Sequence, residues 1–145
     1  MSCARSALIR GLLAVSFLLT SMPASAAAPP VEGLWLTDDG KAVVRVAPCG
    51  RQMCGSIVRV LDRDPDVPTT DANNPDRTRR SRPIIGLQVL RGFNPGSAAW
   101  EGGQAYDPKS GKSYRSSLKL NRDGSLRVTG CVLFLCQSVR WTKSR

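Results

Sequence analysis

The sequence contains no histidine among its 145 residues. This absence excludes Ser-His-Asp triads, Cys-His pairs and HExxH metal sites, because each of them needs an imidazole. No glycine-rich loop has the spacing of a known phosphate-binding motif. A carboxylate pair such as Asp71 with Asp107 remains available for acid and base chemistry, but most chains of this size offer such a pair. We therefore expect a protein that is not an enzyme and that uses no cofactor and no metal.

Acidic and aromatic residues are both scarce. The chain has 21 Lys and Arg against 11 Asp and Glu, which gives a formal net charge of +10, and aromatic residues make up 6%. An anionic envelope component, whether polymer or lipid head group, is therefore an electrostatically favoured partner, although a well-solvated basic surface is the plainer interpretation. Nucleic acid is not an expected partner, because the basic residues are not interleaved with aromatic side chains as in a stacking platform.

Long apolar runs are missing except near the start of the chain. Two arginines accompany the almost wholly apolar run Gly11–Thr20, and Ala24-Ser25-Ala26 forms a small-x-small cleavage site. The run is shorter than the roughly 20 apolar residues that a transmembrane helix needs. We predict a signal peptide over residues 1–26, with cleavage after Ala28 as the alternative. The mature protein is then periplasmic or secreted and has no transmembrane segment.

Cleavage leaves residues 27–145, which are 119 residues and enough for a single domain with one core. The leader removes two basic residues and no acidic one, so 19 basic against 11 acidic residues leave a formal net charge of +8. There are no internal repeats and no low-complexity segments.

Four cysteines remain after the leader, in two pairs with the same spacing, Cys49 with Cys54 and Cys131 with Cys136. Four cysteines allow three pairings. A gap of four residues suits the two arms of a tight hairpin, so we predict a local disulfide within each pair. A zinc site with four thiolates is the alternative, but the usual CxxC spacing is absent and an oxidising compartment disfavours it.

The mature chain alternates between short apolar-periodic segments and turn signals, without a sustained helical period. Eight strands are expected: Val31–Thr37, Lys41–Pro48, Met53–Leu61, Ile84–Arg91, Gly102–Asp107, Lys112–Leu120, Ser125–Val132 and Cys136–Thr142. Short joins make sequential strands antiparallel neighbours, and such a sheet buries one face by curling into a barrel or folding into a sandwich. We therefore predict an all-β domain.

One long loop, Asp62–Pro83, separates the third and fourth expected strands, and it is rich in Asp, Arg and Pro. A loop of this length in a small domain usually carries a function or is disordered. Its arginines, Arg82 among them, can bind a carboxylate or phosphate of a ligand, or can pair with the aspartates of the same loop. The spacing of Asp62, Asp64 and Asp66 suggests calcium, but the glycine and the closing glutamate of an EF-hand are absent.

The segment between the last two cysteines, Val132–Leu135, is wholly apolar, although turns usually contain Gly, Asn or Asp. Two interpretations stand. The four side chains fold back and seal an open barrel end, or they protrude and contact a membrane or a protein partner.

Gly33-Leu34-Trp35 opens the first strand, and we expect Trp35 to cap the core of the sheet. Further motifs follow along the whole mature chain: Ala47-Pro48-Cys49-Gly50 with Cys54-Gly55, Asp71-x-x-Asn74-Pro75, Arg82-Pro83-x-x-Gly86, Trp100-x-x-Gly103, Tyr106-Asp107-Pro108-x-x-Gly111-Lys112-x-Tyr114, and Gly130-Cys131 with Cys136 and Arg140-Trp141. Together they resemble the exported bacterial family catalogued as domain of unknown function twenty-one forty-seven.

This resemblance implies a single eight-stranded antiparallel up-and-down barrel, similar to the lipocalins, with one long loop between strands 3 and 4. It also implies that Arg140 lies over Trp35 and closes one end of the barrel. A lipocalin-type helix after the last strand is missing, since only Lys143–Arg145 follow Thr142. Because a fold does not determine a function, ligand binding is implied only by analogy.

Two functions are compatible with these observations. In the first, a barrel mouth lined by Trp100, Tyr106 and Tyr114, with Arg82 or Asp107 supplying polarity, binds a small apolar or amphipathic molecule. In the second, the barrel is filled and its basic surface contacts an anionic polymer, a membrane or a protein of the cell envelope. An eight-stranded barrel has room for one small ligand or for side chains alone, so the size of the cavity distinguishes the two.

Overall fold

The structure is a computed structural model that describes residues 28–145, so the expected signal peptide lies outside the described residues. Within them the chain forms eight strands and one short 3-10 helix: β1 Gly33–Leu36, β2 Ala42–Cys49, β3 Gln52–Val60, η1 Arg77–Arg79, β4 Gln88–Pro95, β5 Trp100–Asp107, β6 Lys112–Leu120, β7 Leu126–Val132 and β8 Leu135–Lys143. Over residues 28–145, no helix has both the length and the apolar character needed to cross a membrane.

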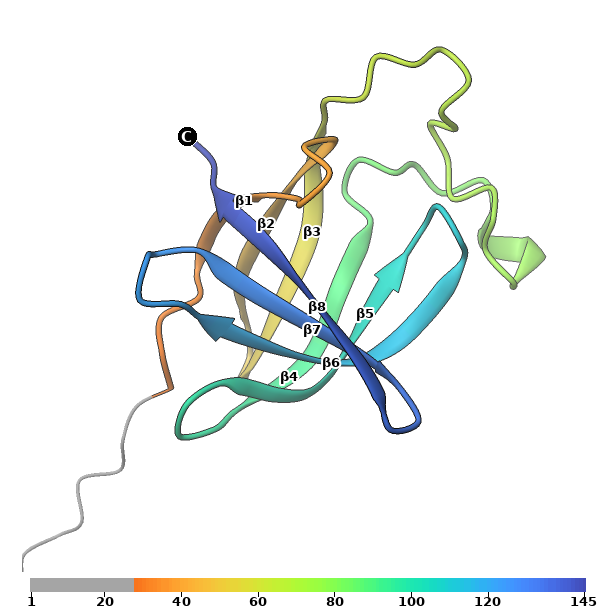
Figure 1. Cartoon of the computed structure of the whole chain (residues 1–145). Helices are drawn as coiled ribbons and strands as arrows, with labels where there is room; N and C mark the ends of the chain where they lie inside the picture. Colours follow the sequence, from red (N-terminus) through yellow and green to blue (C-terminus); the bar gives the residue numbers. More distant parts are fainter. Residues whose placement is uncertain (1–27) are drawn as a thin grey trace, which may run out of the picture.

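The eight strands close into one antiparallel barrel in the order β1 to β8 (Figure 1). Closure occurs where β1 pairs with β8, with Trp35 opposite Lys143 and Leu36 opposite Thr142. Most strands join through short turns, and short joins bring sequential strands together as antiparallel neighbours. The predicted all-β, up-and-down barrel with one long loop between the third and fourth strands is confirmed.

The fourth strand differs from its prediction, because β4 begins at Gln88 instead of Ile84. Gly86 has a φ of +88°, which an extended strand does not allow, and Pro83 has no N–H for a sheet hydrogen bond. Ile85 is therefore left in the loop with 62% of its surface exposed.

The connections define two ends of the barrel. The open end carries the segments 37–41, 61–87, 108–111 and 133–134, and the closed end carries 50–51, 96–99 and 121–125. In Figure 1 the long yellow-green loop and the dark-blue β7–β8 turn both belong to the open end.

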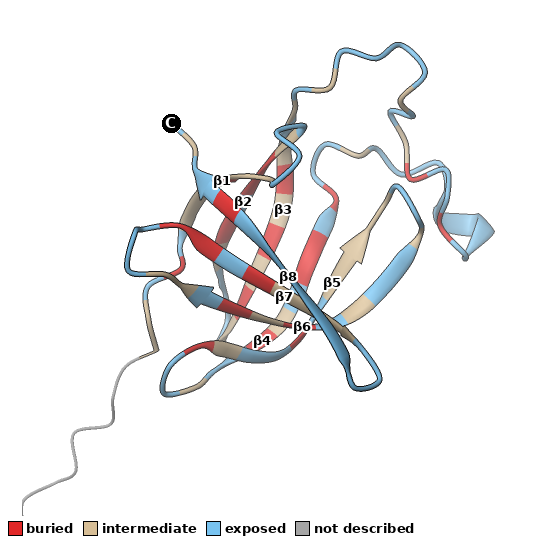
Figure 2. Ribbon diagram, viewed as in Figure 1, coloured by how far each residue is buried: buried red, intermediate tan, exposed pale blue. Residues whose placement is uncertain are grey.

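The closed end is filled with large apolar side chains. Trp35, Phe93 and Leu118 are fully buried, and buried positions alternate with less buried ones along the strands (Figure 2). The indole N–H of Trp35 donates to the backbone oxygen of Val31 at 2.9 Å, so the polar atom of the ring is also satisfied. Phe93 lies directly against Gly103, where a Cβ would clash with its ring. Trp35 therefore packs as the expected cap of the core.

The cation over Trp35 is Lys143 and not Arg140, which corrects the implied closure. The amine of Lys143 lies 4.5 Å from the centre of the Trp35 ring. Arg140 instead forms an ion pair with Asp123 at 2.9 Å on the exposed surface. The reason is the two-residue period of a strand: Trp141 is buried, so its neighbour Arg140 faces out, while Lys143 shares the side of Trp141.

Both predicted disulfides are present, Cys49–Cys54 and Cys131–Cys136. The first links β2 to β3 near the closed end, and the second links β7 to β8 near the open end. The tip of the second hairpin, Val132–Leu135, does not seal the barrel. Its four side chains are 57%, 91%, 86% and 70% exposed in chain order. These four residues form a tight turn, and the Cys131–Cys136 disulfide cross-links its base. Their side chains therefore extend away from the barrel instead of folding over it.

Candidate functional site

An open cavity of about 550 Å³ occupies the open end of the barrel. Seven strands each contribute at least one side chain to its wall: Val44, Ile57, Leu90, Ala105, Tyr114, Val128 and Trp141. The wall is thus mostly apolar, and Tyr106 adds a third aromatic ring to those of Tyr114 and Trp141. Cavities of about 300–1,000 Å³ are typical of sites for small molecules.

The rim of the cavity is charged. Lys41 pairs with Asp62 at 2.7 Å, and Lys109 pairs with Asp39 at 2.5 Å. The first pair joins the β1–β2 turn to the long loop, and the second joins that turn to the β5–β6 turn. An apolar wall below a ring of charged groups provides separate environments for the two parts of an amphipathic molecule.

The carboxylate of Asp39 is held strongly in its charged form. Burial favours the neutral acid, but hydrogen bonds from Lys109, from the Thr37 hydroxyl and from the backbone of Lys41 outweigh it and lower the pKa of Asp39 to about 2. The hydrogen bond and charge of Lys41 lower the pKa of Asp62 in the same direction. Both rim carboxylates therefore remain ionised at neutral pH.

Three of the five residues predicted to bind a ligand line the cavity, namely Tyr106, Asp107 and Tyr114. Tyr114 stands opposite Ala105 in the β5–β6 register, and both belong to the wall. The Asp107 carboxylate accepts from the Ser110 hydroxyl at 2.6 Å and so helps to form the β5–β6 turn.

The other two predicted residues are not part of the cavity wall. Trp100 is the first residue of β5, which begins at the closed end, and its indole N–H donates to the backbone oxygen of Pro29 at 2.8 Å. Arg82 pairs with Asp71 at 2.9 Å in the long loop. Trp100 thus holds the segment before β1 against β5, and Arg82 stabilises the long loop through Asp71.

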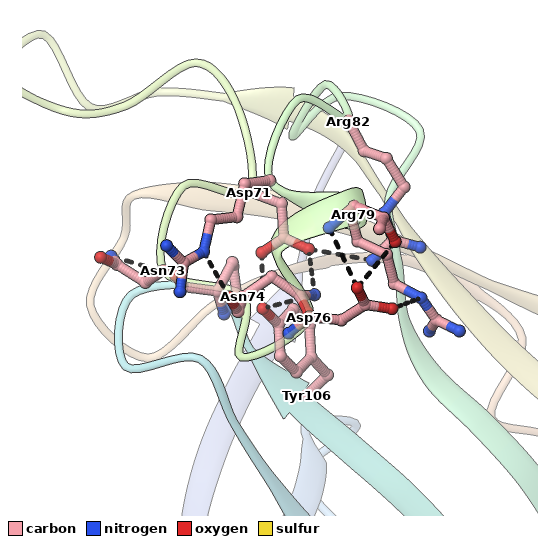
Figure 3. Close-up of polar contacts among 10 residues, drawn as sticks. Asp71, Asn73, Asn74, Asp76, Arg79, Arg82 and Tyr106 are labelled. Carbon is pink, nitrogen blue, oxygen red and sulfur yellow. Dashed lines mark hydrogen bonds and ion pairs between the residues drawn. The ribbon is translucent and has the colours of Figure 1, made fainter.

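A buried carboxylate attaches the long loop to β5 (Figure 3). The side chain of Asp71 is fully buried and accepts from the Tyr106 hydroxyl at 2.5 Å, the Asn74 amide at 2.7 Å and the Arg82 guanidinium at 2.9 Å. The backbone bridge between Thr70 and Pro83 closes the base of the same segment. These contacts, called the loop clamp below, hold residues 70–83 as an ordered unit beside the cavity.

The loop clamp shifts the pKa of both central groups. Burial opposes ionisation of Asp71, but the hydrogen bonds from Tyr106, Asn74 and Arg82 outweigh it and lower the pKa of Asp71. Burial, followed by the hydrogen bond to Asp71, raises the pKa of Tyr106 to about 12. The pair is thus fixed as carboxylate and neutral phenol at neutral pH.

Two of the five arginines in the loop pair with aspartates of the same loop, which was one of the two interpretations from the sequence. Besides the Arg82–Asp71 pair, Arg79 meets Asp76 at 3.0 Å. For calcium, no group of three or more acidic, Cys or His residues within the described chain is placed to hold a metal ion. The backbone N–H of Asp64 instead donates to Asp62 within the loop.

Several cavity residues were not singled out from the sequence. Asp39 and Lys109 were not named there, and Lys41 was only the first residue of an expected strand. They meet because the β1–β2 and β5–β6 turns lie at one end, which no local pattern reveals. Lys143 had a local signal, since it stands two residues beyond Trp141 on the same side of β8.

A bacterial family described as uncharacterized protein conserved in bacteria, DUF2147, matches residues 33–143. The chain belongs to this family. The resemblance based on the motifs is thereby confirmed over nearly the whole described chain. No curated protein matches the sequence.

A solved structure supports the fold of this DUF2147 chain independently. Protein HP1028 from Helicobacter pylori, described as belonging to the lipocalin family, superposes with a TM-score of 0.69. The match covers 80% of this chain and 84% of that chain at 21% sequence identity. Similarity at this level shows that the two proteins share the barrel fold.

Proposed function

We propose that this DUF2147 chain is an exported binding protein, not an enzyme, and that it holds a small amphipathic molecule in the open end of its barrel. The observation that carries the proposal is the open cavity of about 550 Å³, which has an apolar wall and a charged rim. A filled interior, the alternative considered from the sequence, does not fit such a space. The lipocalin-like fold is compatible with this function but does not by itself support it.

Two lysines of the rim provide partners for an anionic head group, although four aspartates, Asp38, Asp39, Asp62 and Asp107, also line the cavity. Lys41 and Lys109 are about half exposed, with side-chain exposures of 48% and 60%, and each meets one carboxylate. A ligand carboxylate can replace Asp39 as the partner of Lys109, because the Asp39 side chain is 38% exposed and keeps its hydrogen bonds from the Thr37 hydroxyl and the Lys41 backbone. Asp62 is only 10% exposed and retains Lys41 as its partner. The hydrocarbon or aromatic part of the same ligand then contacts Val128 and Trp141 below the rim. A fatty acid or an aromatic acid has this chemistry.

Export is supported by two independent features. The first is the apolar run followed by a small-x-small cleavage site before residue 27. The second is the presence of two disulfides, which persist in oxidising compartments such as the periplasm or the extracellular space.

Tryptophan fluorescence tests the proposal, because of the three tryptophans only Trp141 lines the cavity. Titration with a fatty acid should produce a saturable change in emission that Trp141→Phe removes and Trp100→Phe retains. An alcohol of the same chain length should bind more weakly, since it lacks the charge that Lys41 and Lys109 attract. Absence of any saturable change with acids or alcohols would contradict the proposal.

A variant that fills the cavity provides a second, independent measurement. Ala105 lines the wall of the cavity, and Ala105→Phe should abolish binding by occupying the space. Ala47→Phe is the matched control, since Ala47 is on β2 and outside the wall. Thermal unfolding of both variants shows whether the barrel is intact, and native mass spectrometry counts the bound ligand. Equal binding by the two variants would place the ligand elsewhere.

A further inference from the structure

The β7–β8 hairpin ends in an apolar tip at the mouth of the barrel. The tip consists of Val132–Leu135, and Leu133 and Phe134 are the most exposed of its side chains at 91% and 86%. Gln137 and Val139 on the same hairpin line the cavity, so the tip stands beside its opening. In Figure 2 the turn and the β8 arm of the hairpin are coloured as exposed and extend from the barrel.

The backbone of the tip is strained. Leu133 has a φ of +54° and is the one non-glycine residue with a positive φ in residues 28–145. Glycine occupies the corresponding place in the other cross-linked hairpin, where Gly50 has a φ of +69°. Side chains with a Cβ rarely adopt this conformation, and the Cys131–Cys136 disulfide cross-links the base of the turn. The tip therefore presents large apolar side chains at a position where glycine would be more stable in water.

Basic residues line the outer face of the adjoining strands. Lys119 and Arg140 each stand directly opposite Arg127 across β6, β7 and β8, and all three are exposed. Arg115 is opposite Cys131, next to the tip. Asp123 is paired with Arg140 and offsets only one of these charges. Like charges directly across a sheet repel one another, and an anionic surface relieves that repulsion.

We propose that the β7–β8 hairpin docks the protein on an anionic phospholipid membrane. The tip inserts among the acyl chains, and the outer face of β6–β8 lies along the head groups, with Arg115 nearest to the inserted side chains. This combination of apolar insertion and basic charge is the one that interfacial membrane anchors use. The mouth of the barrel then opens close to the bilayer.

Two other occupants fit the hairpin less well. A stable protein interface needs about 800 Å² from each partner, whereas the apolar tip is convex and only four residues long. A second copy of the chain would bring a further charge of +8 against the same basic face, which opposes self-association. A fluid anionic surface accommodates a convex tip without a matching groove.

Sedimentation with lipid vesicles tests the docking. The wild-type chain should bind vesicles that contain phosphatidylglycerol and bind vesicles of phosphatidylcholine alone much more weakly, with binding that decreases as salt is added. Lys119→Gln with Arg127→Gln should weaken binding to anionic vesicles by about fivefold for each charge removed. No binding of the wild-type chain to anionic vesicles at low salt would overturn the proposal, whether or not the cavity binds a ligand.

Changes at the tip separate insertion from attraction by charge alone. Leu133→Gly with Phe134→Ser should reduce vesicle binding at least about tenfold, while thermal stability is retained or increased because the turn loses its strain. Ile85→Ser is the matched control, since it removes an apolar side chain that is 62% exposed on the long loop, and its binding should equal that of wild type. In Phe134→Trp, the emission of the new indole should shift to the blue on anionic vesicles. Unchanged binding by the tip variant, or an unshifted indole on bound protein, would overturn insertion.

Discussion

The two cross-linked hairpins have the same cysteine spacing but different registers. In the β7–β8 hairpin Cys131 stands directly opposite Cys136, whereas in the β2–β3 hairpin Cys49 stands opposite Gln52 and Cys54 opposite Ala47. The Cα atoms of the two disulfides are accordingly 4.0 Å and 5.8 Å apart.

The position of glycine explains this difference. Gly50 follows Cys49 immediately and takes the positive φ of a two-residue turn, so the turn lies beside the first cysteine. The β7–β8 turn has no glycine, and Leu133 takes the positive φ at the centre of the loop. Cysteine spacing thus determines which residues are linked, while the turn residues determine the register and what the tip presents to solvent.

The two ends of the barrel differ as well, because one is packed and the other holds the cavity. The largest expected loss of stability is at the closed, packed end. Trp35→Ala should reduce the free energy of unfolding by about 3–5 kcal/mol, because Trp35 is fully buried in the packed half of the barrel. Lys143→Met should cost only about 0.5–1 kcal/mol, which is the usual size of an exposed cation–π contact. Denaturation in urea measures both. Tyr114→Ala, at the open cavity, should reduce the free energy of unfolding clearly less than Trp35→Ala. Equal losses for the two variants would contradict the conclusion that the closed end is packed more tightly than the open end.

The loop clamp at the open end should depend on acid. Asp71→Ala should cost about 1.5–3 kcal/mol per charged hydrogen bond that the clamp loses without a replacement. Because the pKa of Asp71 is lowered in the folded state, its contribution is complete above the ordinary carboxyl pKa of 3.8 and is lost as the pH falls through the lowered value. The protection of residues 70–83 against hydrogen exchange, taken relative to the intrinsic exchange rate at each pH, should therefore fall in acid.

The matched variant for this prediction is Asp71→Asn, which keeps the shape of the side chain and removes its charge. Its loop should show low protection already at neutral pH and little further loss in acid. A protection of the wild-type loop, relative to the intrinsic rate, that is the same at neutral and acid pH would contradict a role for the Asp71 carboxylate.

The disulfides should contribute equally despite their different registers. In the chain-entropy account the stabilisation by a disulfide depends on the length of the loop that it closes. The sequence separation is 5 for both disulfides. Replacing both cysteines of either pair by serine should therefore cost about 2 kcal/mol in each case. Denaturation of the two double variants tests this, and a difference well above 1 kcal/mol would show that register or strain also contributes.

The smallest expected effect comes from exchanging the turn residues. Leu133→Gly should stabilise the protein by about 0.5–1 kcal/mol, because relief of a strain of about 1–2 kcal/mol exceeds the greater flexibility of glycine in the unfolded chain. Gly50→Leu should cost about 0.5–1 kcal/mol by the same balance in reverse, since no atom stands within 4 Å of the added Cβ. Thermal unfolding of both variants checks the opposite signs, and two losses would disprove that Leu133 is strained.

Much of the barrel could be predicted from local patterns. The expected strand Lys112–Leu120 has the same bounds as β6, because its alternation and its flanking turns are both clear. The fourth strand was placed four residues too early, since the apolar run that includes Ile85 has the same composition as a buried strand. For the site, Tyr106, Asp107 and Tyr114 were placed correctly near one another, whereas Trp100 lies at the closed end because its strand begins there.

By itself the sequence determined the features that depend on neighbouring residues: the short strands, the turns between them, the local disulfides and the up-and-down order that follows from short connections. Only the tertiary structure decided which residues meet after closure. Asp71 and Tyr106 are 35 residues apart, and Trp100 is 71 residues from Pro29. Their contacts depend on how the long loop and the segment before β1 pack against β5. The contact of Lys143 with Trp35 depends on how the last strand pairs with the first, because the register of that closure places the two residues opposite each other.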